Sequence, residues 1–172
     1  MPQHTFAATD PDTYVEDVKA AWKPTVEGPR VVVEALEIQA PLVSTGALAG
    51  ALVLPDPPAA TWYEQTQPPG ADKGATLIAS HVDSGFGDAA PFSRLHAIKK
   101  GTPIEIRDAA GKTHKYKASS IQVYERQAVP REVFELTGKP RLVLVTCSGP
   151  TVNSGSAAHY LYNLVVVATP IS

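Results

Sequence analysis

Prolines and glycines interrupt this sequence so often that long regular elements have little room to form. The 172 residues include 16 prolines and 12 glycines. Because proline breaks helices and glycine favours turns, this density favours many short strands over long helices. A chain of this length is one ordinary domain, large enough to bury a substantial core. We therefore expect an all-β barrel or sandwich of about eight strands, edged by short helices.

The one good helix candidate lies near the N-terminus. Asp10 can cap it, Pro11 suits its first turn, and Pro24 ends it. We therefore divide the chain into an N-terminal extension with a short helix, over residues 1–28, and a β-barrel domain over residues 29–172.

Beyond this helix the apolar residues follow the pattern of strands. The expected strands cover residues 30–38, 40–43, 51–55, 75–80, 102–124 (a hairpin turning at "DAAGK"), 141–147 and 162–169. Between them, "TWYEQTQPPGADKG" (61–74) is expected to be a loop, and "APFSRL" (90–95) a short helical turn.

Composition excludes several classes of function. The net charge is −2, from 15 Lys+Arg against 17 Asp+Glu, and no basic run exceeds two residues, so nucleic acid is not an expected partner. One cysteine excludes an internal disulfide and a Cys-rich zinc site, and we expect no metal and no cofactor. No apolar run is long enough to span a membrane, and the N-terminus does not resemble a signal peptide. The protein is either cytosolic or preceded by an export segment upstream of residue 1.

The single cysteine stands in "RLVLVTCSGP" (141–150). Four apolar residues run into Thr146 and Cys147 before the chain breaks at Ser-Gly-Pro. This pattern predicts that Cys147 lies at a strand end, where a loop lets the thiol meet a substrate. The alternative is that Cys147 is a small buried hydrophobic residue, the common state of a lone cysteine in an apolar strand.

A second apolar strand ends in "ASHVDSGFGDAAPF", at His81. A nucleophile candidate and a base candidate at two strand ends are typical of thiol catalysis, provided that they meet in space. His81 alone could equally be an ordinary loop residue. Asp83 could orient the imidazole or cap the following loop.

With both segments in view, the chain resembles the sortase family. Sortases carry a Thr-Leu-x-Thr-Cys-type motif at the end of a late strand, and here it stands as Leu144-Val145-Thr146-Cys147. The segment "TLIASHVDSGFGDAAPFSRLHAIKKG" looks closest to class F, with relatives in class E. "IQAPLVSTGALAGALVLPDPPAATWYEQTQPPGADKG" and "HYLYNLVVVA" also match that class, so the resemblance covers roughly residues 30–170.

The resemblance implies an eight-stranded sortase-type β-barrel and a monomeric enzyme outside a Gram-positive-type cell. It would be membrane-anchored through a segment upstream of residue 1. Such enzymes cleave an LPxTG-type sorting signal of surface proteins after the Thr, through a thioester on the cysteine. They then pass the acyl group to an amine, usually of a peptidoglycan precursor. On this basis Cys147 would be the nucleophile and His81 the general acid/base.

One departure from the family pattern concerns an arginine. Sortases use an arginine on the strand after the Cys loop to bind substrate and stabilise the oxyanion, but no arginine follows Arg141 here. Leu161 takes its place in one alignment and Asn163 in another. The candidates for the missing oxyanion or substrate contact are Asn163, Arg94, Tyr160, Tyr162 and Thr146.

Three functions are therefore weighed. The first is a cysteine transpeptidase whose signal side chains pack against "ERQAVPREVFELTGKP" (125–140). The second is a sortase-fold protein that has lost turnover and binds wall peptides, which the missing arginine favours. The third is a hydrolase that uses water as acceptor and shares the same residues.

Overall fold

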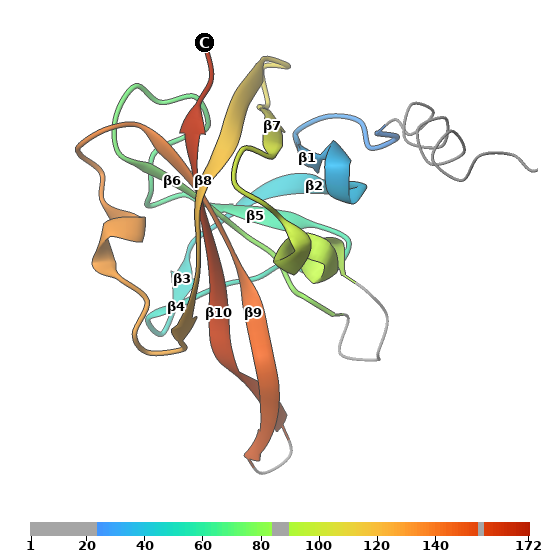
Figure 1. Ribbon diagram of the computed structural model, residues 1–172, viewed down its shortest axis with the longest axis vertical. Coiled ribbons are helices and arrows are strands. Elements are labelled where there is room, and N and C mark those ends of the chain that lie inside the picture. The colour runs from blue at the N-terminus through green and yellow to red at the C-terminus, as the bar shows by residue number, and fades with distance from the viewer. Residues whose placement is uncertain (1–23, 84–89, 155–156) are drawn as a thin grey trace, which may run out of the picture.

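The computed structural model describes residues 24–83, 90–154 and 157–172, and their strands close into a barrel (Figure 1). The barrel strands are β1 (Arg30–Val33), β2 (Ile38–Thr45), β5 (Ala60–Tyr63), β6 (Ala75–Ala79), β7 (Pro103–Arg107), β8 (Thr113–Glu125), β9 (Arg141–Ser154) and β10 (Ala157–Pro170). Their order around the barrel is β1-β2-β5-β6-β9-β10-β8-β7. The predicted eight-stranded all-β barrel is thereby confirmed. The predicted N-terminal helix lies mostly within residues 1–23, outside the described residues.

The remaining elements are short. A separate two-stranded sheet pairs β3 (Ala47–Leu48) with β4 (Ala51–Leu52). Three 3-10 helices complete the set: η1 (Glu34–Leu36), η2 (Pro91–Ala97) and η3 (Arg131–Phe134). The helical turn predicted at 90–95 is confirmed as η2. In the described part of the chain, no helix has the length and apolar character to cross a membrane.

The prediction of one continuous strand over 30–38 was wrong, because η1 divides this range between β1 and β2. The chain turns back at η1, so that β1 and β2 pair antiparallel with Val33 opposite Ile38. Glu37 closes the turn in the left-handed region, with φ of 50°, and its N–H donates to the Glu34 carbonyl at 2.9 Å. Because the turn contains no glycine or proline, the apolar residues on its two sides predict a single strand.

The segment predicted as a loop over 61–74 begins inside a strand. β5 pairs with β2 in parallel and with β6 antiparallel, and it therefore closes the barrel between them. Trp62 lies in β5, and its indole N–H donates to the Gln67 carbonyl at 2.9 Å. This bond holds the start of the following loop against the barrel wall.

Alternation along the strands builds two apolar layers. In β9, Leu142 and Leu144 are buried inside the barrel, whereas Val143 belongs to a second cluster on its outer face. The segment over residues 126–140, which includes η3, covers this outer cluster with Val133, only 5% exposed. The Ala75 N–H donates to the Glu135 carbonyl at 2.7 Å and fixes the segment to β6.

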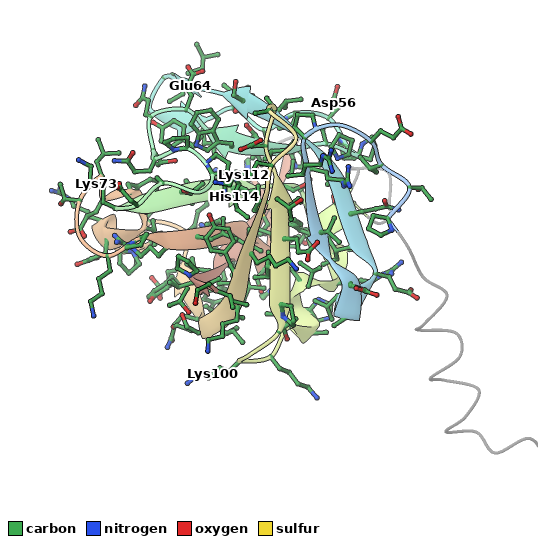
Figure 2. The ribbon with its side chains drawn as sticks, turned by 90° about the horizontal axis from the view of Figure 1, so that it is seen from above. Asp56, Glu64, Lys73, Lys100, Lys112 and His114 are labelled. Carbon is green, nitrogen blue, oxygen red and sulfur yellow. The ribbon has the colours of Figure 1, made fainter. Side chains whose placement is uncertain are left out.

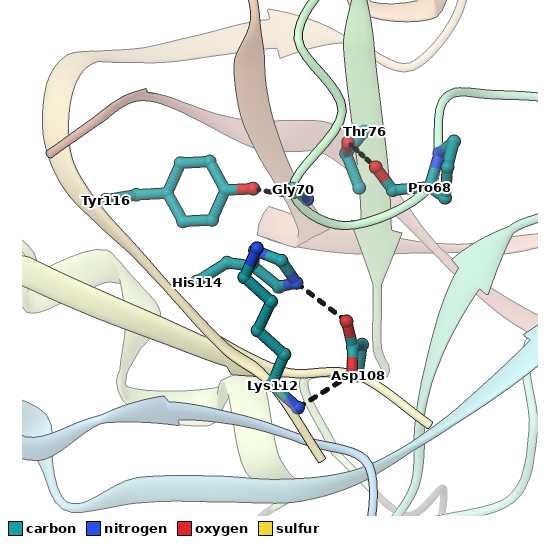
Figure 3. Close-up of polar contacts among 7 residues, drawn as sticks. All are labelled: Pro68, Gly70, Thr76, Asp108, Lys112, His114 and Tyr116. Atoms are coloured by element: carbon teal, nitrogen blue, oxygen red, sulfur yellow. Dashed lines mark hydrogen bonds and ion pairs between the residues drawn. The ribbon is translucent and has the colours of Figure 1, made fainter. Parts of the chain in front are cut away.

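The hairpin turn between β7 and β8 marks one end of the barrel, and Figure 2 looks onto that end, where Lys112 and His114 lie. His114 Nε2 is 2.7 Å from Asp108 Oδ2 across the turn (Figure 3). Beside it, the Gly70 N–H donates to the Tyr116 hydroxyl at 3.0 Å. Gly70 has φ of +81°, and a Cβ there would lie 2.1 Å from the His114 ring. Glycine is therefore required for this loop to pack on the hairpin.

Candidate active site

Cys147 lies where strand β9 loses one of its two neighbours. β6 pairs with β9 in parallel up to the Ala79–Val145 pair, and the Ser80 N–H then donates to the Val145 carbonyl at 3.3 Å. β9 itself continues to Ser154, paired with β10, as the long arm that extends beyond the barrel in Figure 1. The predicted strand end at Cys147 is therefore wrong: the strand continues, and the neighbouring strand ends there. Among the described residues, the β6–β9 ladder does not extend as far as Cys147.

The same register brings the segment with His81 next to the segment with Cys147. The last paired residues, Ala79 and Val145, lie two residues before His81 and Cys147, respectively. The Thr146 hydroxyl donates to the Ser80 carbonyl at 2.9 Å, and both residues are buried. This bond joins the residue before the thiol to the residue before the imidazole, and so it holds their spacing.

Asn163 faces Cys147 from the other side. It is the direct antiparallel partner of Cys147, and its partner on β8 is Tyr124. Directly opposite residues in an antiparallel pair point to the same face. Tyr124, Asn163 and Cys147 therefore form a row across three adjacent strands.

The two tyrosines of β10 lie on the opposite face from Asn163, by alternation. The Tyr160 hydroxyl donates a hydrogen bond to the Asp83 carboxylate, which ties the segment after His81 to β10. This bond, together with some burial, raises the pKa of the Tyr160 hydroxyl. Tyr162 packs on Gly149, where a Cβ would lie 2.4 Å from the ring, and Gly149 has φ of +77°.

Arg94 is turned toward a different contact. Its guanidinium donates to the Glu37 carboxylate and to the Leu36 carbonyl, both at 3.3 Å. It therefore binds η2 to the end of η1, and nothing places it at the thiol.

Burial and two charges set the state of the thiol. Burial raises the pKa of Cys147, the positive charge of Arg126 lowers it, and the negative charge of Asp83 raises it further. Burial dominates, so the protonated thiol is favoured at neutral pH. Sequence reasoning missed Arg126. The only available signal was its position just after the long strand of the 102–124 hairpin, and that signal did not say which strand lies next to it.

A hollow of about 180 Å³ opens beside the thiol. Its lining comes from the segment after His81, from η2 and from both strands of the β9–β10 hairpin: Val82, Phe92, His96, Thr146, Cys147, Ser148, Gly149, Tyr160 and Leu164. Phe92 is fully buried and anchors η2 in the barrel interior. Within the described residues, no three His, Cys, Asp or Glu side chains gather in a way that could hold a metal ion.

The fold and this site define a class: closed mixed barrels that carry a cysteine on one strand and a histidine just after the end of the neighbouring strand. The family model of the sortase domain matches residues 31–171, and the chain therefore belongs to the sortase family. Sortases are cysteine transpeptidases. A search of curated proteins finds no significant match.

Solved sortase structures share the fold. Sortase C2 of Group B Streptococcus pilus island 1 matches with a TM-score of 0.65 at 21% identity, covering 84% of this chain and 73% of that one. Sortase A of Corynebacterium diphtheriae, as a lid mutant, gives 0.65 at 18% identity over 92% and 77%. Sortase A of Listeria monocytogenes gives 0.62 at 18% identity over 84% and 86%.

Proposed function

We propose that this sortase cleaves an LPxTG-type sorting signal through a thioester on Cys147 and transfers the acyl group to a cell-wall amine. The observation that supports the proposal is the β6–β9 register, which ends two residues before His81 and Cys147 and so brings their two segments together. A thiol and an imidazole held side by side are the minimum that thiol acyl transfer requires.

The proposed reaction moves one proton between the Cys147 thiol, the His81 imidazole and the two amines. His81 takes the thiol proton, and the sulfur attacks the carbonyl carbon of the signal's Thr, whose π electrons move to oxygen. When this oxyanion collapses, the carbon–nitrogen bond breaks and His81 returns the proton to the leaving amine. An incoming amine then attacks the thioester, loses a proton to the imidazole, and releases Cys147 as the thiol.

The apolar part of the signal has a binding surface on the outer face of the barrel. Tyr63 and Phe134 meet edge to face, with ring centroids 6.4 Å apart. Phe134 is 44% exposed and Leu136 49% exposed, although both belong to the segment that covers the outer cluster. Exposed apolar side chains of this kind suit the Leu and Pro of the signal.

The finer assignments also belong to this proposal. The run from His81 to Asp83 and the buried Phe92-x-x-Leu95 pair of η2 support class F, with class E related. The thiol peptidase would act as a monomer at the cell surface, anchored in the membrane through a segment upstream of residue 1. Surface proteins would supply the signal, and a peptidoglycan precursor would supply the amine.

The test is mass spectrometry of the intact protein and its products after incubation with an LPxTG peptide and an amine acceptor. Because Cys147 is the only cysteine, any thioester adduct reports on this residue. Cys147→Ala serves as the inactive control, and His81→Ala separates acylation from simple binding. We expect a peptide–amine product with the unaltered protein and none with Cys147→Ala.

The other outcomes point to the alternative functions. Cleavage without transfer would indicate a hydrolase. No product and no adduct over several signal variants would overturn the proposal and leave a binding protein, the function that the missing arginine favoured.

A further inference from the structure

The only arginine or lysine on the two strands that carry Cys147 and Asn163 is Arg141, which lies at the far start of β9 and is paired with Glu135. An attacked carbonyl develops negative charge on oxygen, and a thiol that must ionise develops it on sulfur. Asn163 is a neutral donor, and a neutral hydrogen bond is roughly half as strong as a charge-assisted one. Chemistry at Cys147 would therefore gain from a cation supplied by another element.

Arg126 stands at the end of β8, one residue beyond the last pair. β8 pairs with β10 through Glu125 and Tyr162, and the Arg126 N–H then donates to the Leu161 carbonyl at 3.0 Å. Its backbone is therefore held to β10 although its side chain is exposed.

Alternation along the chain gives the side chain its direction. Arg126 follows Tyr124 by two residues, so both point to the same face, the face of Asn163 and Cys147. The thiol lies two strands away, about 10 Å across the sheet. A side chain as long as arginine can cover much of that distance across Asn163.

The electrostatics agree with this placement. Among the described residues, Arg126 is the one positive charge that acts on the thiol, and it lowers the pKa of Cys147 against burial. No ion pair involving Arg126 forms within the described part of the chain. By contrast, Arg94 and Arg141 are paired with Glu37 and Glu135.

We propose that Arg126, from the end of β8, supplies the positive charge that stabilises the ionised sulfur of Cys147 and, in the acyl transfer, the oxyanion formed beside it. The role toward sulfur is independent of any substrate, whereas the role toward the oxyanion rests on the proposed function.

Two readouts test the two roles. The first is the rate of iodoacetamide alkylation as a function of pH, which reports the pKa of Cys147 alone because the chain has a single cysteine. The second is kcat and KM with an LPxTG peptide and an amine acceptor. The variants are Arg126→Gln, which removes the charge, Arg126→Lys, which retains it, and Lys117→Gln as an exposed control on β8, outside the segment over residues 126–140.

We expect the alkylation profile of Arg126→Gln to move to higher pH, and Arg126→Lys to lie closer to the unaltered protein. The shift should shrink in about 1 M salt, because an exposed charge is screened. In turnover, Arg126→Gln should lose about 10²-fold, mostly in kcat, because the charge acts on the transition state. Arg126→Lys should recover at least tenfold of this loss, and Lys117→Gln should match the unaltered protein within twofold.

The outcomes separate the inference from the proposed function. An unshifted alkylation profile with full turnover in Arg126→Gln overturns the inference and leaves the function standing. A shifted profile in a protein that makes no product supports the role toward sulfur and overturns the proposed function. A shifted profile with full turnover overturns the role toward the oxyanion.

Discussion

The hydrogen bond from Thr146 to Ser80 joins the two chain segments that carry Cys147 and His81. Its donor precedes the cysteine and its acceptor precedes the histidine. Thr146→Val keeps the side-chain shape but leaves the buried Ser80 carbonyl without this donor, which costs about 1–3 kcal/mol.

We therefore expect Thr146→Val to lower the free energy of unfolding by about that amount and to reduce acylation of Cys147. Urea titration and adduct formation are the two measurements. The exposed Thr169→Val, on β10, is the matched control and should change neither. Equal losses in both variants would show that the bond has no special role.

Gly149 shapes the segment directly after the cysteine. The register between β9 and β10 shifts here, so that Gly149 and Pro150 oppose the single residue Leu161. The Tyr162 ring lies over the glycine, and a Cβ would lie 2.4 Å from its Cδ2. A methyl group at this position must displace the ring or the strand.

Gly149→Ala should thus destabilise the protein more than the left-handed backbone alone explains. Gly101→Ala isolates the backbone cost, because Gly101 also has positive φ, +87°, with nothing within 4 Å of a Cβ. The backbone alone costs about 1–2 kcal/mol. Thermal unfolding of the two variants gives the comparison, and a Gly149→Ala loss no larger than that of Gly101→Ala would contradict the contact.

At the scale of elements, the local sequence pattern predicted most strands but did not predict which strands lie next to one another. The apolar run at 141–145 and the helical turn at 90–95 were predictable, because periodicity and proline act within a few residues. The end of β9 was not, because Ser-Gly-Pro is also compatible with a bulged strand held by a long-range partner. Arg126 was missed for the same reason: its relation to Cys147 exists only through the β8–β10 register.

The segment over residues 126–140 is the element that would discriminate between signals. It is fixed to the barrel by the Gly74 N–H, which donates to the Gly138 carbonyl at 2.9 Å, yet its Phe134 side chain remains exposed. An apolar side chain that contributes little to the core is free to serve binding.

Phe134→Ala should raise KM for an LPxTG peptide several-fold with little change in kcat, because uniform binding is lost. The cost in stability should stay near the 0.5–1.5 kcal/mol of an aromatic pair, about the worth of its contact with Tyr63. Val123→Ala, also exposed but on β8, is the control and should leave KM unchanged. A fall in kcat alone would place Phe134 outside the signal's binding surface.

On the scale of the whole molecule, the candidate active site and a structural ion pair lie at opposite ends of the barrel. β8 runs from Thr113 to Glu125, about 40 Å of strand, and its two ends carry different groups. Arg126 and the Cys147 site lie at one end. Asp108 and His114 close the hairpin turn at the other (Figure 3).

Ionisation of the Asp108 carboxylate should therefore make the stability of the fold depend on pH in the acid range, and it should leave the reactivity of Cys147 unchanged. The hydrogen bond from His114, and next the Lys112 N–H, lower the pKa of Asp108 below its ordinary value of 3.8. A carboxyl group whose pKa is lower in the folded state stabilises the fold above the unfolded pKa. That contribution is lost as the pH falls through the folded pKa.

Asp108→Asn keeps an acceptor for the Lys112 N–H but removes the charge, so the variant should have a lower Tm than the unaltered protein near pH 7. The gap should begin to close as the pH falls below about 4, the ordinary pKa, and should be closed once the pH is below the lower folded pKa, where the native carboxyl group is neutral as well. Asp56→Asn, at an exposed position without a side-chain hydrogen bond among the described residues, should show no such convergence. Alkylation of Cys147 should be the same in all three proteins at neutral pH. A constant gap in Tm from pH 7 to pH 2 would mean that shape, and not charge, holds this end of the barrel together.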